Sequence, residues 1–180
     1  MRIEDANRPI AVRIGAILTA AAAISGCFYP PMAHPPSADQ ERTRLEVPYD
    51  LAWDAINSVI KRNNYSVRAQ DPTHGIVEAQ GTTFTLQDAD CGEFRSLGGR
   101  FAVDPGAASS AEYNFHLKAD GPEASIVEVE ATFVAPLALP LRRPSSTECV
   151  SRGTNESRLL GEVVKQAAQE RRPIYMKPDR

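Results

Sequence analysis

The chain has 180 residues, of which 20 are lysine or arginine and 23 are aspartate or glutamate, so its formal net charge is −3. An acidic surface is repelled by phosphate backbones, and no basic stripe with interleaved aromatic residues offsets this repulsion, which argues against nucleic acid as a partner. The length allows one domain with a proper core but is too short for two comfortable ones.

The first 26 residues have the pattern of a secretory signal peptide. Arg2, Arg8 and Arg13 lie in a polar start, and the stretch 14–24 carries no charge and is mostly alanine and isoleucine. Crossing the hydrocarbon core takes about 20 apolar residues, roughly twice what this stretch offers. We therefore expect residues 1–26 to be an export signal and not a membrane-spanning helix.

The run Ile24-Ser25-Gly26-Cys27 ends this segment. It resembles the lipobox of bacterial lipoproteins, a family in which the cysteine becomes the new N-terminus and carries acyl chains such as palmitate. The resemblance implies lipidation of Cys27 and attachment to a membrane, with an ordinary cleaved signal or a buried apolar helix as the alternatives. In similar lipoproteins, a residue other than aspartate after the cysteine usually accompanies export to the outer membrane, and Phe28 stands there.

Two further cysteines remain once Cys27 is assigned to lipid. An even number of cysteines in an exported chain predicts a disulfide, here between Cys91 and Cys149, with two separate buried thiols as the alternative. Neither lies in the C-x-x-C spacing typical of redox catalysis or zinc binding.

The mature chain divides into a tether, a domain and a tail. Residues 27–41 contain four prolines between positions 28 and 37, which favour polyproline II and predict a tether. The folded domain is expected over residues 42–172, and residues 173–180 form the tail.

The domain is predicted to start with a strand and a helix. Residues 43–47 alternate apolar and polar side chains, and Pro48 stops this strand. A helix follows, because apolar residues recur at helical spacing up to Ile60, and Asn63 and Asn64 can cap its end. Shorter strands are predicted at 65–69, 76–79 and 82–86, then a loop at 87–100 and a strand at 100–103.

The clearest pattern is a hairpin. Residues 111–118 and 127–133 alternate strictly and are separated by Asp120-Gly121-Pro122, so both strands present one apolar face. A loop at 137–144 and a helix at 155–169 complete the domain, with Pro173 ending the helix. The core face of this helix is predicted to hold Leu159, Leu160, Val163, Val164 and Ala167. The order of elements indicates an α+β fold, a curved antiparallel sheet with two helices packed on one face.

Residues 47–56, 65–67 and 71–77 together resemble the opening of small proteobacterial lipoprotein domains of the BamC type. In that family a strand leads into a helix that carries a tryptophan, here Trp53, and an aspartate-turn-glycine step leads into a further strand. The resemblance implies a helix-grip layout, in which the sheet wraps around its helices.

No nucleophile elbow, H-E-x-x-H pair, Walker loop or G-x-G-x-x-G is present, so we predict no catalytic residue and no cofactor. His34, His74 and His116 fall in the tether, a turn and a strand, and their spacing does not predict a metal site.

Three acidic or polar groups are better explained by a structural role than by catalysis or ligand binding. The acidic run 88–93 lacks the glutamate that a calcium loop needs at its twelfth position, where Gly99 stands. Glu128 and Glu130 share the polar face of one strand, and we interpret them as solvent-facing and not as a catalytic pair. The segment 151–156 could hold an anion at a helix start, although capping is favoured.

These observations predict a non-enzymatic lipoprotein on the periplasmic side of the outer membrane, acting as an assembly, scaffold or envelope-maintenance factor with an envelope protein partner. Tyr49 and Trp53 are candidate contact residues, although core anchorage is favoured for both. The alternative is a module that carries a lipid or small hydrophobic ligand, and an unrecognised hydrolase is the third reading. Ligand carriage predicts a pocket larger than ~300 Å³. Its expected lining is Tyr113, Phe115, Val129 and Phe133.

Overall fold

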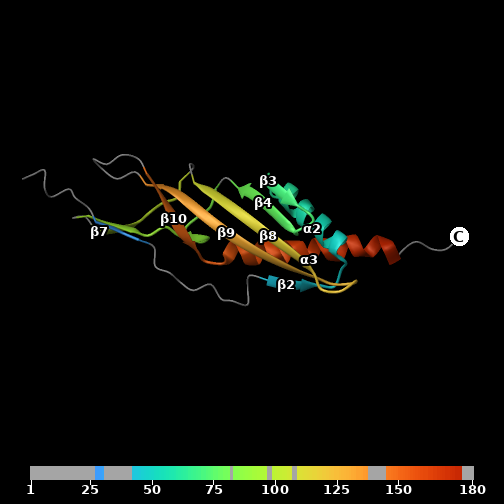
Figure 1. Ribbon diagram of the computed structural model, residues 1–180. Helices are drawn as coiled ribbons and strands as arrows, with labels where there is room; N and C mark the ends of the chain where they lie inside the picture. The colour runs from blue at the N-terminus through green and yellow to red at the C-terminus, as the bar shows by residue number, and fades with distance from the viewer. Residues whose placement is uncertain are drawn as a thin grey trace, which may run out of the picture.

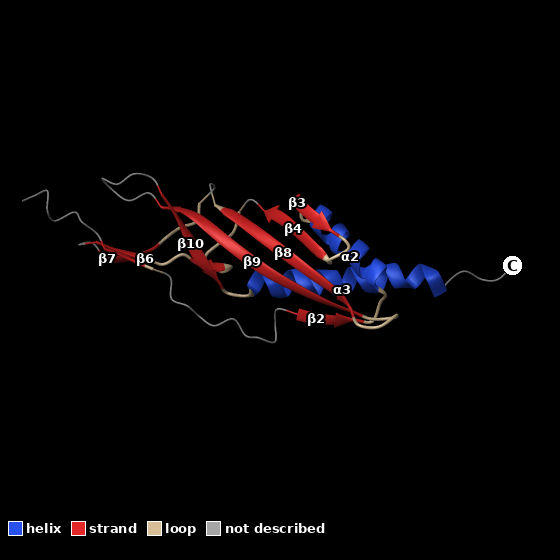
Figure 2. Cartoon of the chain, viewed as in Figure 1, coloured by secondary structure: helices blue, strands red, loops and turns tan. Residues whose placement is uncertain are grey.

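The protein is described by a computed structural model over residues 27–30, 42–81, 83–96, 99–106, 109–137 and 145–175, with the backbone alone for Ser96 and positions 172–175. Over these residues it is an α+β protein with two helices and antiparallel sheets (Figures 1 and 2). The predicted signal at 1–26, positions 31–41 of the predicted tether and the tail from 176 onward lie outside the described residues.

The strands form a main sheet and a small sheet. The main sheet has the order β3-β4-β8-β9-β10-β5, with β2 paired to β9, and the small sheet has the order β1-β6-β7. The strands of the main sheet are β2 (Arg42–Leu45), β3 (Ser66–Asp71), β4 (Ile76–Gly81), β5 (Ala89–Asp90), β8 (Ser110–Ala119), β9 (Ser125–Leu137) and β10 (Ser145–Ser151). Those of the small sheet are β1 (Cys27–Tyr29), β6 (Glu93–Ser96) and β7 (Gly99–Ala102).

The core lies between the main sheet and the helices α2 (Tyr49–Arg62) and α3 (Thr154–Tyr175), which cover the same face of the sheet (Figure 2). The predicted hairpin is confirmed, since β8 and β9 pair from Ser110↔Val134 to Ala119↔Ser125. Every second side chain of these strands points into the core, as a period of two requires. The largest of the buried side chains are Tyr113, Phe115, Phe133, Ile56, Ile60 and Leu159.

Two turns contain a residue with a positive φ. Asn64 has a positive φ of 55° after the end of α2, which is the left-handed cap expected there. Gly75 has a φ of +70°, and a Cβ added to it would lie 1.9 Å from the backbone oxygen of Leu117. The Leu117 N–H also donates to the Gly75 oxygen at 2.7 Å, so the turn before β4 is held directly against β8.

The strand predicted at 82–86 is wrong. Residues 83–85 have no regular structure, and a turn follows at 86–88. The Asp88 carboxylate accepts hydrogen bonds from the Thr85 N–H at 2.8 Å and its hydroxyl at 2.9 Å, and the Asp88 N–H donates to the Thr85 oxygen. These local bonds satisfy groups that a strand would offer to a neighbour. Phe84 is still buried, through a tilted ring contact with Phe133 at 4.8 Å.

Other boundaries also differ from the prediction. The predicted loop at 87–100 contains β5, β6 and the start of β7, because β5 pairs with β10, β6 pairs with β1, and β6 and β7 form a short hairpin. Val164 is exposed and not in the core, because it lies at the edge of the buried stripe of α3. The helix α3 also continues past Pro173, which lies in its last turn, where one missing backbone donor removes a single hydrogen bond.

Candidate functional site at the small sheet

The small sheet contains Cys27, and it places this residue beside two arginines. The first three residues of the predicted tether form β1, which pairs with β6 so that Cys27 lies opposite Arg95. Arg95 in turn lies opposite Arg100 of β7. Residues directly opposite each other share one face of a sheet, so the three side chains form a single row. Strands are about 4.8 Å apart, which puts the Cα of Arg100 roughly 10 Å from that of Cys27.

The face that carries this row, which we call the Cys27 face, is exposed and contains more positive than negative groups. The Cys27 thiol is free and exposed, and the Tyr29 side chain is 42% exposed. The Arg95 guanidinium lies 5.3 Å from the centre of the Tyr29 ring, a cation–π distance. Arg100 donates from Nε to the Glu93 carboxylate at 2.6 Å. No described carboxylate forms an ion pair with Arg95. The face has a net positive charge, because it contains Arg95 and Arg100 but only one described carboxylate, that of Glu93.

The opposite face of the small sheet has a different chemistry. Phe28 lies opposite Phe94, and Phe94 lies opposite Phe101, which gives a row of three phenylalanines across the three strands. Phe28 packs against the hydrophobic core, whereas Phe101 at the outer edge is 55% exposed. The small sheet is therefore attached to the body by its phenylalanine face and leaves the Cys27 face outward.

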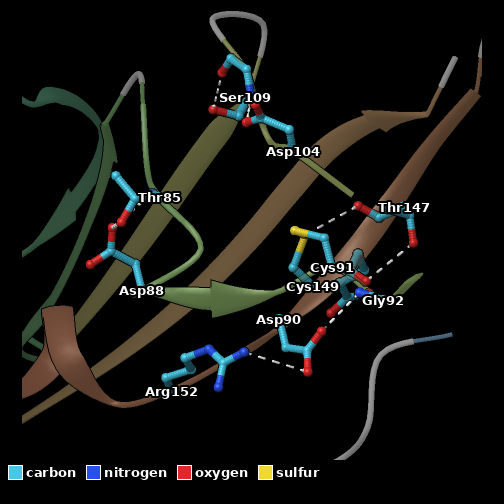
Figure 3. The surroundings of a disulfide bond; sticks show 12 residues. Thr85, Asp88, Asp90, Cys91, Gly92, Asp104, Ser109, Thr147, Cys149 and Arg152 are labelled. Atoms are coloured by element: carbon cyan, nitrogen blue, oxygen red, sulfur yellow. Dashed lines mark hydrogen bonds and ion pairs between the residues drawn. A yellow bond between two sulfur atoms is a disulfide. The ribbon is translucent and has the colours of Figure 1, made fainter. Parts of the chain in front are cut away.

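A disulfide joins β10 of the main sheet to the segment between β5 and β6, which leads into the small sheet (Figure 3). The predicted bridge between Cys91 and Cys149 is confirmed, and Cys91 lies two residues before β6 while Cys149 lies in β10. The Gly92 N–H donates to the Asp90 carboxylate at 2.9 Å, and the Gly92 oxygen accepts from the Val103 N–H at 3.0 Å. Both ends of the β6–β7 hairpin are thus fixed at the bridge.

The acidic run that precedes β6 is used by these local contacts. The Asp88 carboxylate accepts a hydrogen bond from the Thr85 N–H, whereas the Asp90 carboxylate forms an ion pair with Arg152 at 3.6 Å (Figure 3). The two carboxylates therefore point to different partners. Among the described residues, no group of three or more histidine, cysteine or acidic side chains is placed to hold a metal ion.

The start of α3 is filled by the protein's own groups. The Glu156 side chain is buried near the first turn, and its carboxylate accepts from the Ser151 hydroxyl. The same hydroxyl accepts from the Gly153 N–H at 3.0 Å, and Thr154 donates from its hydroxyl to the Gln87 oxygen at 3.1 Å. A carboxylate at the positive end of the helix dipole supports the capping interpretation over anion binding.

The predicted contact residues Tyr49 and Trp53 lie on the first turns of α2. Both are half-buried and pack against the core, their rings are stacked at 6.3 Å, and the Tyr49 hydroxyl donates to the Pro72 oxygen at 2.6 Å. Burial raises the pKa of Tyr49, with Asp71 and Asp50 adding to the effect. The start of α2 follows β2, whose Leu45 pairs with Ser125 at the beginning of β9. The small sheet lies at the opposite end of the molecule, so this pair is far from it (Figure 1).

The other face of the main sheet has a polar hollow of about 510 Å³ that was not expected from the sequence. His74 and His116, which are distant in sequence, both line it together with Glu128 and Glu130. His74 donates to Asp71 at 2.6 Å, and its side-chain and backbone hydrogen bonds hold the pKa of that carboxyl below its usual range. His34 lies outside the described residues. Cross-strand neighbours bring these side chains together, which no local sequence pattern signals.

The residues expected to line a ligand pocket are instead packed together. Tyr113, Phe115, Val129 and Phe133 are each at most 2% exposed. The rings of Tyr113 and Phe133 meet edge-to-face at 6.3 Å, and Tyr65 stacks on Tyr113 at 4.8 Å. A second hollow, of about 610 Å³, is lined by loop residues around Leu86 and by none of these four.

The chain matches no protein-family model and no curated protein in sequence. In the part of the chain that the structure covers, neither helix has both the length and the apolar character of a membrane span.

Proposed function

We propose that the protein is a lipoprotein, anchored through acyl chains on Cys27 to the outer membrane and facing the periplasm. The division of the cysteines is the observation that carries this proposal. Cys91 and Cys149 are bridged, as expected in an oxidising compartment, whereas Cys27 is free and exposed at the start of β1. Its thiol is accessible to a modifying enzyme, and the lipobox-like run directly precedes it.

The role we propose is that of an assembly, scaffold or envelope-maintenance factor that works through a protein partner and not as an enzyme. The length of the body supports this role. The strand β9 has 13 residues, which at about 3.3 Å each extends some 40 Å. The end of the body that carries Tyr49 and Trp53 therefore lies far from the anchor, where a partner in the periplasm can reach it.

A helix-grip layout of the BamC kind is part of the same proposal. Both helices lie against one face of the main sheet, with α2 contacting β8 and α3 contacting β9. The packed core argues against the alternative of ligand carriage, because the apolar side chains that would line the pocket fill it themselves.

Isolation of the intact protein from its native envelope tests the proposal with two readouts. Mass spectrometry should find acyl chains on the Cys27 sulfur of a chain that begins at this residue. The isolated protein should also retain a protein partner that the Trp53→Ala variant loses.

The matched variants are Cys27→Ala and the pair Cys91→Ala/Cys149→Ala. The first should move the domain from the membrane fraction to the soluble fraction, whereas the second should leave it in the membrane fraction, because only the first removes the anchor. An unmodified Cys27 sulfur, or unchanged membrane fractionation of Cys27→Ala, would contradict the anchor.

A further inference from the structure

We propose that the Cys27 face of the small sheet docks flat on a bilayer that contains anionic lipid, so that the domain has a fixed orientation on the membrane. The inference rests on the proposed function, because acyl chains on Cys27 bring this face to the membrane. The register and the charge of the sheet carry it.

The register is the first step. Because Cys27 is paired within β1, the anchor is a part of the folded sheet and no flexible segment separates the two. A lipid attached to its sulfur must enter the bilayer from the Cys27 face. The row formed with Arg95 and Arg100 then lies within about 10 Å of the anchor, which is about one screening length at physiological salt.

Charge complementarity is the second step. Two arginines and one glutamate, Glu93, lie on this face, whereas the whole chain has a net charge of −3. Basic groups beside a lipid anchor are attracted to anionic headgroups, and an acidic body is repelled from them. The two effects favour the same orientation, with the small sheet on the lipid and the body away from it.

The aromatic side chain on this face is the third step. Tyr29 is exposed beside Cys27, and tyrosine is enriched at membrane interfaces because its ring is apolar and its hydroxyl is polar. Its ring contacts the Arg95 guanidinium, so the apolar and cationic groups form one unit at the lipid surface.

Neighbouring residues of β7 provide matched reporters of the orientation. Ala102 lies opposite Glu93 on the Cys27 face, whereas Phe101 lies on the phenylalanine face, and both side chains are exposed. A tryptophan introduced at either position, in a Trp53→Phe background, reports contact with lipids that carry bromine on their acyl chains. The chain from Cys27 onward is coupled through its free thiol to maleimide lipids, in vesicles with equal parts phosphatidylcholine and phosphatidylglycerol.

Docking predicts that bromolipid quenches Ala102→Trp at least about twice as strongly as Phe101→Trp, because the two side chains lie on opposite faces of one strand. The variant Arg95→Gln/Arg100→Gln should reduce the ratio of docked to undocked protein on the order of tenfold. The control Lys61→Gln/Lys165→Gln removes the same charge from the helices, where both lysines are exposed, and should leave the quenching unchanged.

Equal quenching of the two reporters would overturn the proposal, because it indicates a domain that tumbles freely on its anchor. Amide hydrogen exchange of the unsubstituted chain provides a second measurement that needs no new tryptophan. Exchange at residues 99–102 should slow on phosphatidylglycerol vesicles and not on pure phosphatidylcholine vesicles, and equal rates on both would also overturn it. Chemical coupling supplies the anchor here, so a failure of natural acylation is distinguishable from a failure to dock.

Discussion

In the main sheet, β8 and β9 bury most of their alternate side chains under α2 and α3, whereas β7 in the small sheet leaves all four of its residues exposed. The first arrangement stabilises the fold through the removal of apolar area from water. The second is held by backbone pairing, by the packing of Phe28 and by the nearby disulfide. The comparison teaches that the stability of the protein is concentrated in the body, and that the side chains of the small sheet are available for contacts outside the protein.

The same substitution made in both regions should give the largest difference. Phe133→Ala removes a fully buried ring that contacts Phe84 and Tyr113, and it should lower the free energy of unfolding by about 3–5 kcal/mol. Phe101→Ala removes a ring that is more than half exposed and should change it by less than about 0.5 kcal/mol. Urea denaturation of both variants measures the difference, and similar losses would show that the small sheet is part of the core.

Removal of the bridge should separate the two regions. The variant Cys91→Ala/Cys149→Ala opens a loop with a sequence separation of 58, and we expect a loss of about 2–4 kcal/mol in the free energy of unfolding. Because the bridge lies two residues before β6, amide protection at residues 93–102 should fall more than protection in β8.

Cys27→Ser is the control for that variant, since it removes a thiol without opening a bridge. It should leave both the free energy of unfolding and the exchange pattern unchanged. A uniform loss of protection in the double variant would contradict a local role for the disulfide.

The same contrast explains which elements the sequence predicts. The hairpin of β8 and β9 has one face in the core, so its alternation of apolar and polar residues is strict and its register follows. The two helices have apolar stripes for the same reason. The polar strand β10 buries only Cys149, and no described side chain of β6 is fully buried, so neither strand shows such a pattern.

The candidate site could be predicted only in part. The pairing of Cys91 with Cys149 follows from the parity of the cysteines in an exported chain. The row of Cys27 with Arg95 and Arg100 depends on two strand pairings, and the prolines after Tyr29 favour an unpaired tether over β1. The strand predicted at 82–86 is wrong for a different reason. Phe84 is buried because its ring contacts Phe133, and not because it belongs to a strand.

The smallest expected effect is a dependence of stability on alkaline pH that comes from the body alone. Burial, followed by the neighbouring Tyr65, raises the pKa of Tyr113 far above its ordinary value of 10.0. The unfolded chain releases this proton near pH 10, whereas the folded chain retains it. The free energy of unfolding is therefore at its full value below pH ~10 and falls as the pH rises above that value.

Tyr113→Phe should therefore make this fall less steep in urea titrations above pH ~10, because the buried phenol that resists ionisation is gone while the ring remains. Some slope should persist, since burial also raises the pKa of Tyr49. Tyr29→Phe removes an exposed phenol from the small sheet and is the matched control, with the slope of the wild type expected. An equal reduction of the slope by Tyr29→Phe and by Tyr113→Phe would contradict the contrast between the two regions, because it would mean that both bury their tyrosine side chains to the same extent.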